Sequence, residues 1–412
     1  MNTKVKNNVN LTVFCGLLGG FAGIVIWVFL KVMSEGTKLI WEWVPEKLNL
    51  PFYTIIVCTV GAALIGLLRK KYGDYPEELN MVLGKVKNEK QYDYKKMPVM
   101  LLAALLPLLI GSSVGPEAGL TGIIVGLCYW AGDNIKFAHR DAKKYSEIGM
   151  AVTLGVLFHS PLFGIFAVEE QDDEEIPHLT KRSKLLFYGI SIAAATACYM
   201  LLSRIFGKGM EGFPAFEMTG ELIWKDYFMM TVYILAGCIL AVFYEVTHKG
   251  CHKVSAKIPP ILREMLAGLC LGLAGTVVPA IMFSGEEQMG DLMIDYMQYL
   301  PWMLLGVAFL KILITNICIQ SGLKGGHFFP VIFAGVCLGY AIAMFTFADS
   351  AEHVVFAAAI VTAALLGGIM KKPMAVTMLL FICFPVKMFL WIFLAALLGS
   401  KIINILFEKK ED

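Results

Sequence analysis

The sequence has few charged residues for its length. Only 17% of its 412 residues are Asp, Glu, Lys or Arg, whereas 58% are hydrophobic. This composition is typical of an integral membrane protein rather than a soluble one. The formal net charge of +2 is too small to suggest a nucleic-acid-binding protein.

Sequence patterns of cofactor sites and enzymes are also missing. Ten cysteines are scattered, mostly singly within apolar runs, and none forms a CxxC or Cys/His ligand pattern. We therefore interpret them as small core hydrophobes. No nucleophile/base pair, phosphate-binding loop or set of metal ligands is visible. We expect no cofactor, no metal and no enzymatic activity, so a membrane enzyme or a non-conducting scaffold is the least favoured class.

What the sequence does contain is a series of apolar segments. They cover approximately residues 11–33, 53–69, 98–114, 118–136, 146–168, 185–206, 227–247, 262–283, 300–320, 328–348, 353–370 and 373–407. Several are short or split by Gly and Pro, which predicts half-helices, because irregular backbone at membrane depth must be buried or line a watery cavity. The polar stretches 70–97, 171–184 and 248–261 are predicted surface connectors.

The two ends of the chain suggest its orientation. The run from Leu11 to Val32 is long enough to span a bilayer, which favours a retained first helix over a cleaved signal. Lysines 4 and 6 precede it, and lysines 409 and 410 follow the last apolar segment. This bias predicts a multi-pass protein of the cell membrane with both termini in the cytoplasm. The chain ends soon after that segment, so no soluble regulatory domain is expected.

Glycine and proline landmarks occur twice, about 210 residues apart. The landmarks are Gly73, Gly115 and Pro161, spaced by 42 and 46 residues, and Gly285, Gly325 and Pro373, spaced by 40 and 48 residues. We expect one transmembrane domain, 1–412, with two homologous halves near residues 10–247 and 260–407. Broken helices at matching positions of two repeats indicate a transporter's binding site. Chance matching of the landmarks is the alternative.

The stretch SGLKGGHFFPVIFAG (321–335) predicts a helix that begins inside the membrane after Gly325 and Gly326. The first amides of a helix lack intrahelical acceptors and lie at the positive end of its dipole. The amides of His327 and Phe328 are therefore a candidate anion site. A glycine-hinged packing motif is the alternative. His327 is either a pH-sensitive cation beside the anion or a side chain that is simply hydrogen-bonded in place.

The stretch GSSVGPEAGL (111–120) has the same design and one carboxylate. Gly115 and Pro116 predict a helix start, since proline suits the first turn. Glu117 then lies where helix amides favour negative charge. It either competes with an anion as a gate or only stabilises the helix start. An ionisable residue at membrane depth favours the gate.

These residues carry a family resemblance. GGHFFP resembles the G-x-F-x-P motif of the CLC chloride channels and proton/chloride antiporters, GPEAG stands at their G-[KR]-E-G-P, and FHSPLFGIFAVEEQ resembles their N-A-P-L-x-G-x-x-F-x-x-E-E. The match spans roughly residues 50–400. It implies an all-α integral membrane fold with two inverted-topology repeats of tilted and broken helices, and a homodimer in the lipid bilayer with one pore per subunit.

The resemblance also implies the transported species and the site. The substrate is chloride or a similar monovalent anion, with protons as a possible second species and Glu117 as the gating glutamate. The anion-binding positions that it implies are Gly73, Gly115, Ala118, Gly326, His327 and Phe328.

The chain departs from the family where side chains donate to the anion. The family's G-S-G-x-P serine falls on Gly73 in YGDYP, beside Asp74, which would repel an anion if it faced the path. No tyrosine follows Tyr340, although the family has one in its last helix. Pro116 removes one further amide. We therefore expect backbone amides to bind the anion, and to bind it weakly.

The proton pathway is altered as well. The family's second glutamate, ten residues after the proline, falls on Gln171, with Glu170 and Glu169 just before it. A one-residue gap would restore Glu170, so a channel and an antiporter both stay open. The pair Glu286 and Glu287 in FSGEEQMG is expected in a solvated loop. If Asp74, Glu117 and Glu286 shared one cavity, a cation or a proton-coupled organic substrate would be the alternative.

Overall fold

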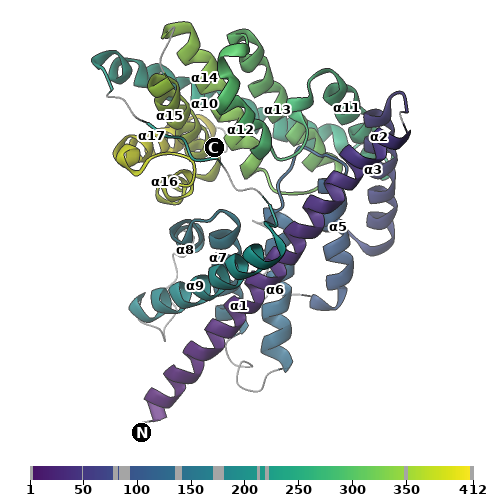
Figure 1. The fold of residues 1–412 in the computed structure, drawn as a ribbon, viewed down its shortest axis with the longest axis vertical. Coiled ribbons are helices and arrows are strands. Elements are labelled where there is room, and N and C mark those ends of the chain that lie inside the picture. Colours follow the sequence, from purple (N-terminus) through teal and green to yellow (C-terminus); the bar gives the residue numbers. More distant parts are fainter. Residues whose placement is uncertain are drawn as a thin grey trace. The chain divides into compact units, whose positions relative to one another are not determined.

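The computed structural model describes residues 3–48, 50–77, 82, 93–134, 142–169, 181–210, 214–218, 222–347 and 351–408. Within these ranges the chain is helical, with no strand and one isolated two-residue β-bridge. Eight of the described helices are long and apolar enough to cross a bilayer. The chain forms two compact units, residues 1–42, 75–105 and 116–211 and residues 43–74, 106–115 and 212–412 (Figure 1).

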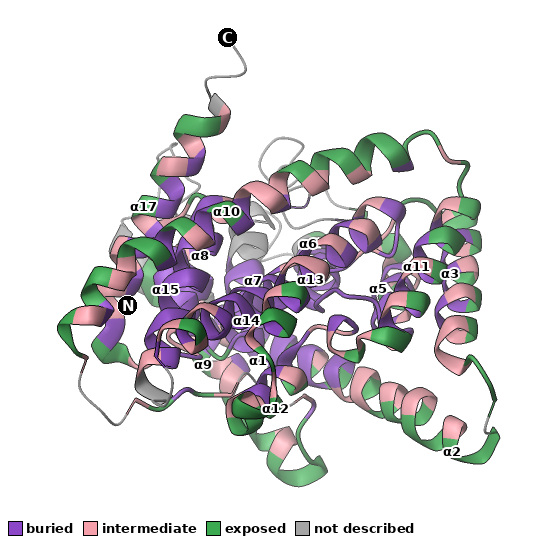
Figure 2. Ribbon diagram, turned by 90° about the horizontal axis from the view of Figure 1, so that it is seen from above, coloured by how far each residue is buried: buried purple, intermediate pink, exposed green. Residues whose placement is uncertain are grey.

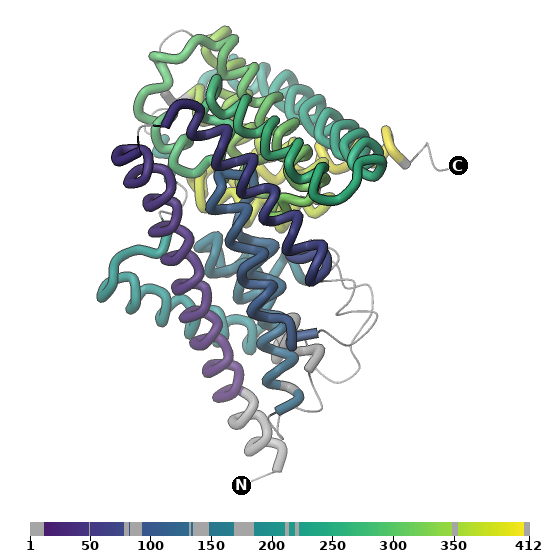
Figure 3. Tube along the Cα trace, turned by 90° about the vertical axis from the view of Figure 1, so that its right-hand side faces the viewer, coloured from purple at the N-terminus to yellow at the C-terminus, as the bar shows by residue number. Residues whose placement is uncertain are grey.

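The first unit is built around its long first helix, drawn in purple in Figure 3. Its helices are α1 (Thr3–Lys38), α6 (Glu117–Asn134), α7 (Ala142–Leu157), α8 (Pro161–Glu169) and α9 (Lys181–Phe206). α1 packs along α9 through small residues: a Cβ at Gly19 would lie 2.1 Å from the Ser191 carbonyl oxygen, and one at Gly23 would lie 2.3 Å from that of Ala195. Small residues four apart let membrane helices approach closely.

The second unit has two buried helices, α14 (Phe328–Thr346) and α15 (Ala351–Met370), at its centre. Its other helices are α2 (Val44–Leu48), α3 (Tyr53–Tyr72), α10 (Trp224–Ser255), α11 (Leu262–Val277), α12 (Glu286–Asp295), α13 (Pro301–Ser321), α16 (Pro373–Leu380) and α17 (Phe389–Glu408). Figure 2 shows α14 and α15 largely in the buried colour, and 83% of each candidate span is buried. Both helices are apolar all round, as expected for the core of a membrane protein.

The predicted helix breaks are present in the structure. The segment 98–114 leaves the helix at Leu109 as α5 (Met97–Leu109), whose residues belong to both units. The segment 146–168 divides between α7 and α8, and 373–407 divides between α16 and α17. Each break coincides with a Gly or Pro, which interrupts the helical hydrogen-bond ladder or supplies the turn.

One connector prediction is wrong. Residues 248–261 are not a surface loop throughout, because α10 stays helical to Ser255. Some of its polar side chains contact α13: the Ser255 and Ser321 hydroxyl oxygens lie 3.1 Å apart, and His252 Nδ1 lies 3.0 Å from the Gln320 Oε1. The lysines 249, 253 and 257 are exposed, as predicted for a surface segment. Half of the connector 70–97 and the first ten residues of the connector 171–184 lie outside the described residues.

Candidate functional site

Two glycine turns lie against each other within the second unit. The Gly115 N–H donates to the Gly326 carbonyl oxygen and the Gly326 N–H donates to that of Gly115, both at 2.7 Å. A Cβ at Gly325 would lie 2.5 Å from a Val114 methyl carbon, so the close approach requires glycine there. The spacing of the landmarks in the sequence matched Gly115 with Gly325, whereas the backbone bridge pairs Gly115 with Gly326.

A helix starts two residues after each bridged glycine. Gly115 leads to Glu117, the first residue of α6, and Gly326 leads to Phe328, the first residue of α14. His327 occupies the N-cap position of α14, and its side chain makes no capping hydrogen bond. Helix starts without a side-chain cap can direct their amides and dipole toward an anion. The predicted position of the α14 start is confirmed; anion binding by Gly326, His327 and Phe328 stays a prediction.

Glu117 is almost completely buried at the start of α6. Only 1% of its surface is exposed, and Ala118 beside it is also buried. The Thr121 hydroxyl donates to the Glu117 carbonyl oxygen at 2.7 Å, which anchors the first helical turn. Consecutive Cα atoms are about 3.8 Å apart, so the Glu117 and Gly115 Cα atoms are within about 8 Å of each other whatever the arrangement of the units.

Asp74 does not present an uncompensated negative charge. The Lys324 Nζ lies 2.8 Å from one carboxylate oxygen, and the Arg69 Nε lies 2.8 Å from the other. Arg69 also pairs with the buried Glu264. Gly73, which stands where the family has a serine, ends α3 by donating its N–H to the Arg69 carbonyl oxygen. The anion-repelling role considered for Asp74 is therefore offset by two cations.

The pKa of Asp74 reflects this competition. Burial raises the pKa, but Lys324 and then Arg69 outweigh it through charge and hydrogen bonding, so the pKa is lowered overall. Because 57% of the Asp74 side chain is exposed, solvent screens these ion pairs, and their contribution to stability is modest.

Two polar features near the glycine bridge were not anticipated from the sequence. The Ser113 and Thr315 hydroxyls lie 2.9 Å apart, both fully buried. Lys311, one turn before Thr315, is also fully buried, and its Nζ lies 2.8–3.1 Å from the carbonyl oxygens of residues 281–283. A lone lysine inside an apolar helix is a signal that could have identified this position.

Glu286 corrects another sequence prediction. FSGEEQMG is not a solvated loop, because α12 begins at Glu286 after Gly285 in a left-handed conformation. Glu286 is buried, whereas Glu287 is exposed. Glu286 and Glu287 differ in burial because successive residues at a helix start point to different sides of the helix.

The candidate proton-pathway residues are mostly outside the described part of the chain. Glu170 and Gln171 lie outside it altogether. Glu169 is the last residue of α8, and its side chain is not among those described. Their assignment stays a prediction. In the ranges that the structure describes, no group of three His, Cys, Asp or Glu side chains could hold a metal ion.

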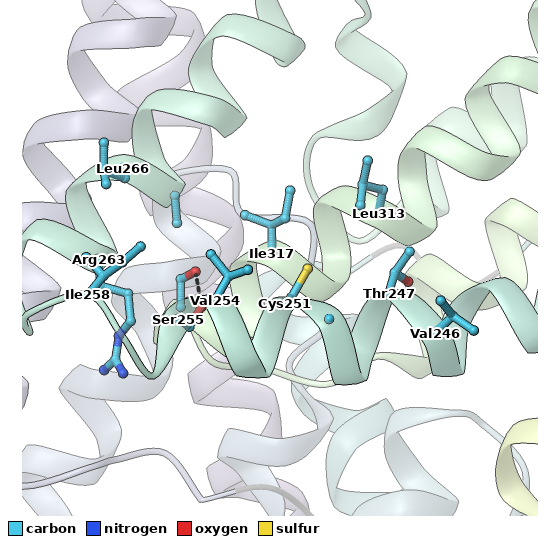
Figure 4. A pocket seen from close by; sticks show the side chains of 13 residues that line it. Val246, Thr247, Cys251, Val254, Ser255, Ile258, Arg263, Leu266, Leu313 and Ile317 are labelled. Atoms are coloured by element: carbon cyan, nitrogen blue, oxygen red, sulfur yellow. Dashed lines mark hydrogen bonds between the residues drawn. The ribbon is translucent and has the colours of Figure 1, made fainter.

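A cavity of about 520 Å³ lies between α10, α11 and α13 (Figure 4). Its lining is mostly apolar, with Thr247, Ser255, Ser321 and Arg263 as the polar contributors. None of the predicted anion-site residues lines it. The cavity is therefore separate from the glycine bridge.

Known proteins with similar sequences are ion-transport proteins. A family model described as "Voltage gated chloride channel" matches residues 61–404. YfeO of Escherichia fergusonii, named as an ion-transport protein, is 24% identical over 353 residues, covering 82% of this chain and 80% of that relative. The protein of the same name from Escherichia coli O7:K1 is 25% identical over the same shares.

Solved structures show the same fold. A CLC-type fluoride/proton antiporter matches with a TM-score of 0.75 and 20% identity, covering 96% of each chain. A slow cyanobacterial Cl⁻/H⁺ antiporter matches with a TM-score of 0.80 and 17% identity, covering 98% of this chain and 95% of the other. The predicted all-α membrane fold is confirmed.

Proposed function

Because the chain belongs to the voltage-gated chloride channel family and moves anions on that scaffold, we propose that its substrate is a monovalent inorganic anion, chloride first. We further propose that the anion binds the backbone amides of His327 and Phe328 and that Glu117 competes with it. Gly73, Gly115, Ala118 and Gly326 would shape the same path.

The bridge between Gly115 and Gly326 carries this proposal. Two 2.7 Å hydrogen bonds hold the turn before α14 against the turn before α6. Backbone amides at a fixed helix start provide a positive potential without a permanent cation, which lets an ion bind and leave again. The bridge therefore supports a site made of backbone rather than side-chain donors.

The short covalent link between Glu117 and Gly115 supports the competing role that we propose for Glu117. Two residues separate it from the bridged Gly115, so its carboxylate is within a side chain's reach of the turn. An ionised carboxylate occupies helix-start amides as an anion would, and a protonated one releases them. Anion flux should therefore rise as the pH falls.

The competing cation hypothesis is less well supported. It required Asp74 to contribute a negative charge to a shared cavity, whereas Lys324 and Arg69 both bind that carboxylate. Fluoride is a nearer rival than any cation, because one structurally similar protein is a fluoride/proton antiporter. The efflux of chloride and of fluoride should therefore be measured in the same experiment. Recording the pH at the same time shows whether protons move with the anion, as in an antiporter, or not, as in a channel.

The test is Glu117→Gln in liposomes. Glutamine keeps size and hydrogen bonding but removes the charge. At anion concentrations that saturate the site, flux should therefore persist or rise and lose most of its dependence on pH. Chloride and fluoride efflux are measured at pH 4.5 and 7.5, with potassium and sodium gradients alongside. If an antiporter is present, proton movement should stop in the variant.

Glu287→Gln is the matched control, because Glu287 also lies in the first turn of a helix but is exposed. It should keep the wild-type pH profile. An unchanged profile in Glu117→Gln would show that Glu117 is only a helix-start residue and would contradict the gating proposal.

Our proposal also covers the membrane, the oligomeric state and the orientation of the protein. It is a multi-pass membrane protein, and we place it in the cell membrane as a homodimer with both termini in the cytoplasm. The family resemblance supports the dimer, and the lysines near both ends support the orientation. The two repeats, near residues 10–247 and 260–407, belong to the same proposal.

A further inference from the structure

A row of polar side chains joins α10 to α13 inside the second unit. Asn316 is fully buried, and its amide nitrogen donates to the Tyr244 carbonyl oxygen at 3.0 Å and to the Thr247 hydroxyl at 2.7 Å. Both amide hydrogens are then used, so the Asn316 Oδ1 acts as acceptor toward His248 Nδ1, 3.4 Å away. This network assigns the hydrogen of neutral His248 to Nδ1.

The other ring nitrogen of His248 is therefore an acceptor. The Gln320 amide nitrogen lies 3.1 Å from His248 Nε2 and 3.3 Å from Nδ1. Because Nδ1 donates to Asn316, the amide donates to Nε2, the nearer of the two. On its other side, the Gln320 Oε1 lies 3.0 Å from His252 Nδ1. His252 is exposed, whereas His248 is partly buried. A proton would therefore bind to His248 at Nε2. The side-chain amide of Gln320 links His248 to the exposed His252.

His248 also approaches the start of α14. Its ring stacks on that of Tyr244 with 5.7 Å between centroids, and the Tyr244 ring lies 5.8 Å from that of His327. His327 is the N-cap residue of α14. The centroids of the His248 and His327 rings are thus within about 12 Å of each other, and His327 belongs to the turn of the proposed anion site.

The neighbours of His248 leave its charge uncompensated. Its side-chain hydrogen bonds in the described part of the chain go to Asn316 and Gln320, which do not titrate. The other acidic, basic and histidine residues on α10 are Lys225, Asp226, Glu245, Lys249, His252 and Lys253. Those on the helices packed against α10 are Lys311 on α13, His327 at the start of α14, Glu352 and His353 on α15, and Lys401 and Glu408 on α17. His353 pairs with Asp226 in the first turn of α10, far along the helix from His248.

We propose that His248 binds a proton during the transport cycle and that the resulting charge strengthens anion binding at the start of α14. A hydronium ion in the water at the His252 end supplies the proton: its O–H bond breaks to leave a water molecule, and an N–H bond forms at Nε2. His252 exchanges its own hydrogen with water, losing it from Nδ1 and gaining one at Nε2, so that its Nδ1 becomes an acceptor. Rotation of the Gln320 amide then presents its oxygen to His248 and its nitrogen to His252. This inference rests on the proposed anion site.

The expected size of the effect follows from the distance. A unit charge about 12 Å away, in surroundings of effective dielectric about 20, changes the affinity for an anion by roughly tenfold. Histidine is the side chain that ordinarily changes charge between pH 5 and 8. Bromide should therefore bind about tenfold more tightly at pH 5 than at pH 7.5.

The experiment uses the full-length protein in detergent with Glu117→Gln, which removes the competing carboxylate. Bromide dissociation constants are measured by calorimetry at both pH values. Adding His248→Gln should abolish the tenfold difference. His159→Asn is the control: His159 lies exposed in the first unit, in a left-handed conformation that asparagine tolerates, and its loss should leave the difference intact.

A second variant covers the case in which His248→Gln does not fold. Gln320→Glu places a carboxylate beside His248 and should move the pH midpoint of bromide binding upward by about one pH unit. An unmoved midpoint, or an undiminished difference in His248→Gln, would overturn the inference. Bromide that binds equally well at both pH values overturns this inference alone, whereas the absence of any bound bromide overturns the proposed anion site.

Discussion

At the scale of the residue, Asp74 illustrates how partners determine the effect of a charge. Its lowered pKa means that it stays ionised below the ordinary aspartate value of about 3.9. Stabilisation by its ion pairs is therefore fully present above that value and is lost only as the pH falls through the lowered one. Between pH 4.5 and 7.5 Asp74 should not titrate.

Asp74→Asn tests this charge balance. It leaves Lys324, two residues before Gly326, without its carboxylate, while Arg69 keeps Glu264. The added positive potential should raise chloride efflux about two- to threefold at low salt. The ratio of efflux at pH 4.5 to that at pH 7.5 should match the wild type, in contrast to Glu117→Gln. A flattened pH ratio in Asp74→Asn would contradict the assignment of pH dependence to Glu117.

At the scale of the element, the contact between α1 and α9 depends on residues without side-chain bulk. The Ser191 hydroxyl donates to the Cys15 carbonyl oxygen at 2.9 Å, so the two helices are joined by a hydrogen bond as well as by packing. Lipid offers no hydrophobic driving force between helices, and close packing with interhelical hydrogen bonds takes its place.

Gly19→Ala should therefore destabilise the first unit. The new methyl group would overlap the Ser191 backbone and force the helices apart, at a cost of roughly 1–3 kcal/mol. Gly189→Ala on α9 is the matched control, since nothing lies within 4 Å of its added Cβ, and alanine favours a helix. Thermal unfolding in detergent should show a lower midpoint for Gly19→Ala alone; equal midpoints would refute the packing argument.

At the scale of the whole molecule, the expected assembly is a homodimer of 45.5 kDa chains. It follows from the family resemblance, and each subunit would hold its own anion path. Mass photometry in detergent should give a protein mass of about twice that of the chain over a range of concentrations. Monomers at every concentration would count against the dimer while leaving the anion-site proposal intact.

The sequence by itself determined the membrane class, the helix breaks and the position of the α14 start. These depend on local properties: a low charge content, long apolar runs, and Gly and Pro that interrupt helices wherever they fall. The burial of Glu117 was foreseeable for the same reason, since it lies in an apolar run right after a helix-start signal.

Only the tertiary structure decided which polar groups meet. Lys324 and Asp74 are 250 positions apart, and Ser113 and Thr315 are 202 apart. The row through His248 needs α10 and α13 side by side, and the burial of Glu286 needs α12 to pack against α14. Such pairings depend on how helices pack rather than on local periodicity, so a single sequence contains no local signal for them.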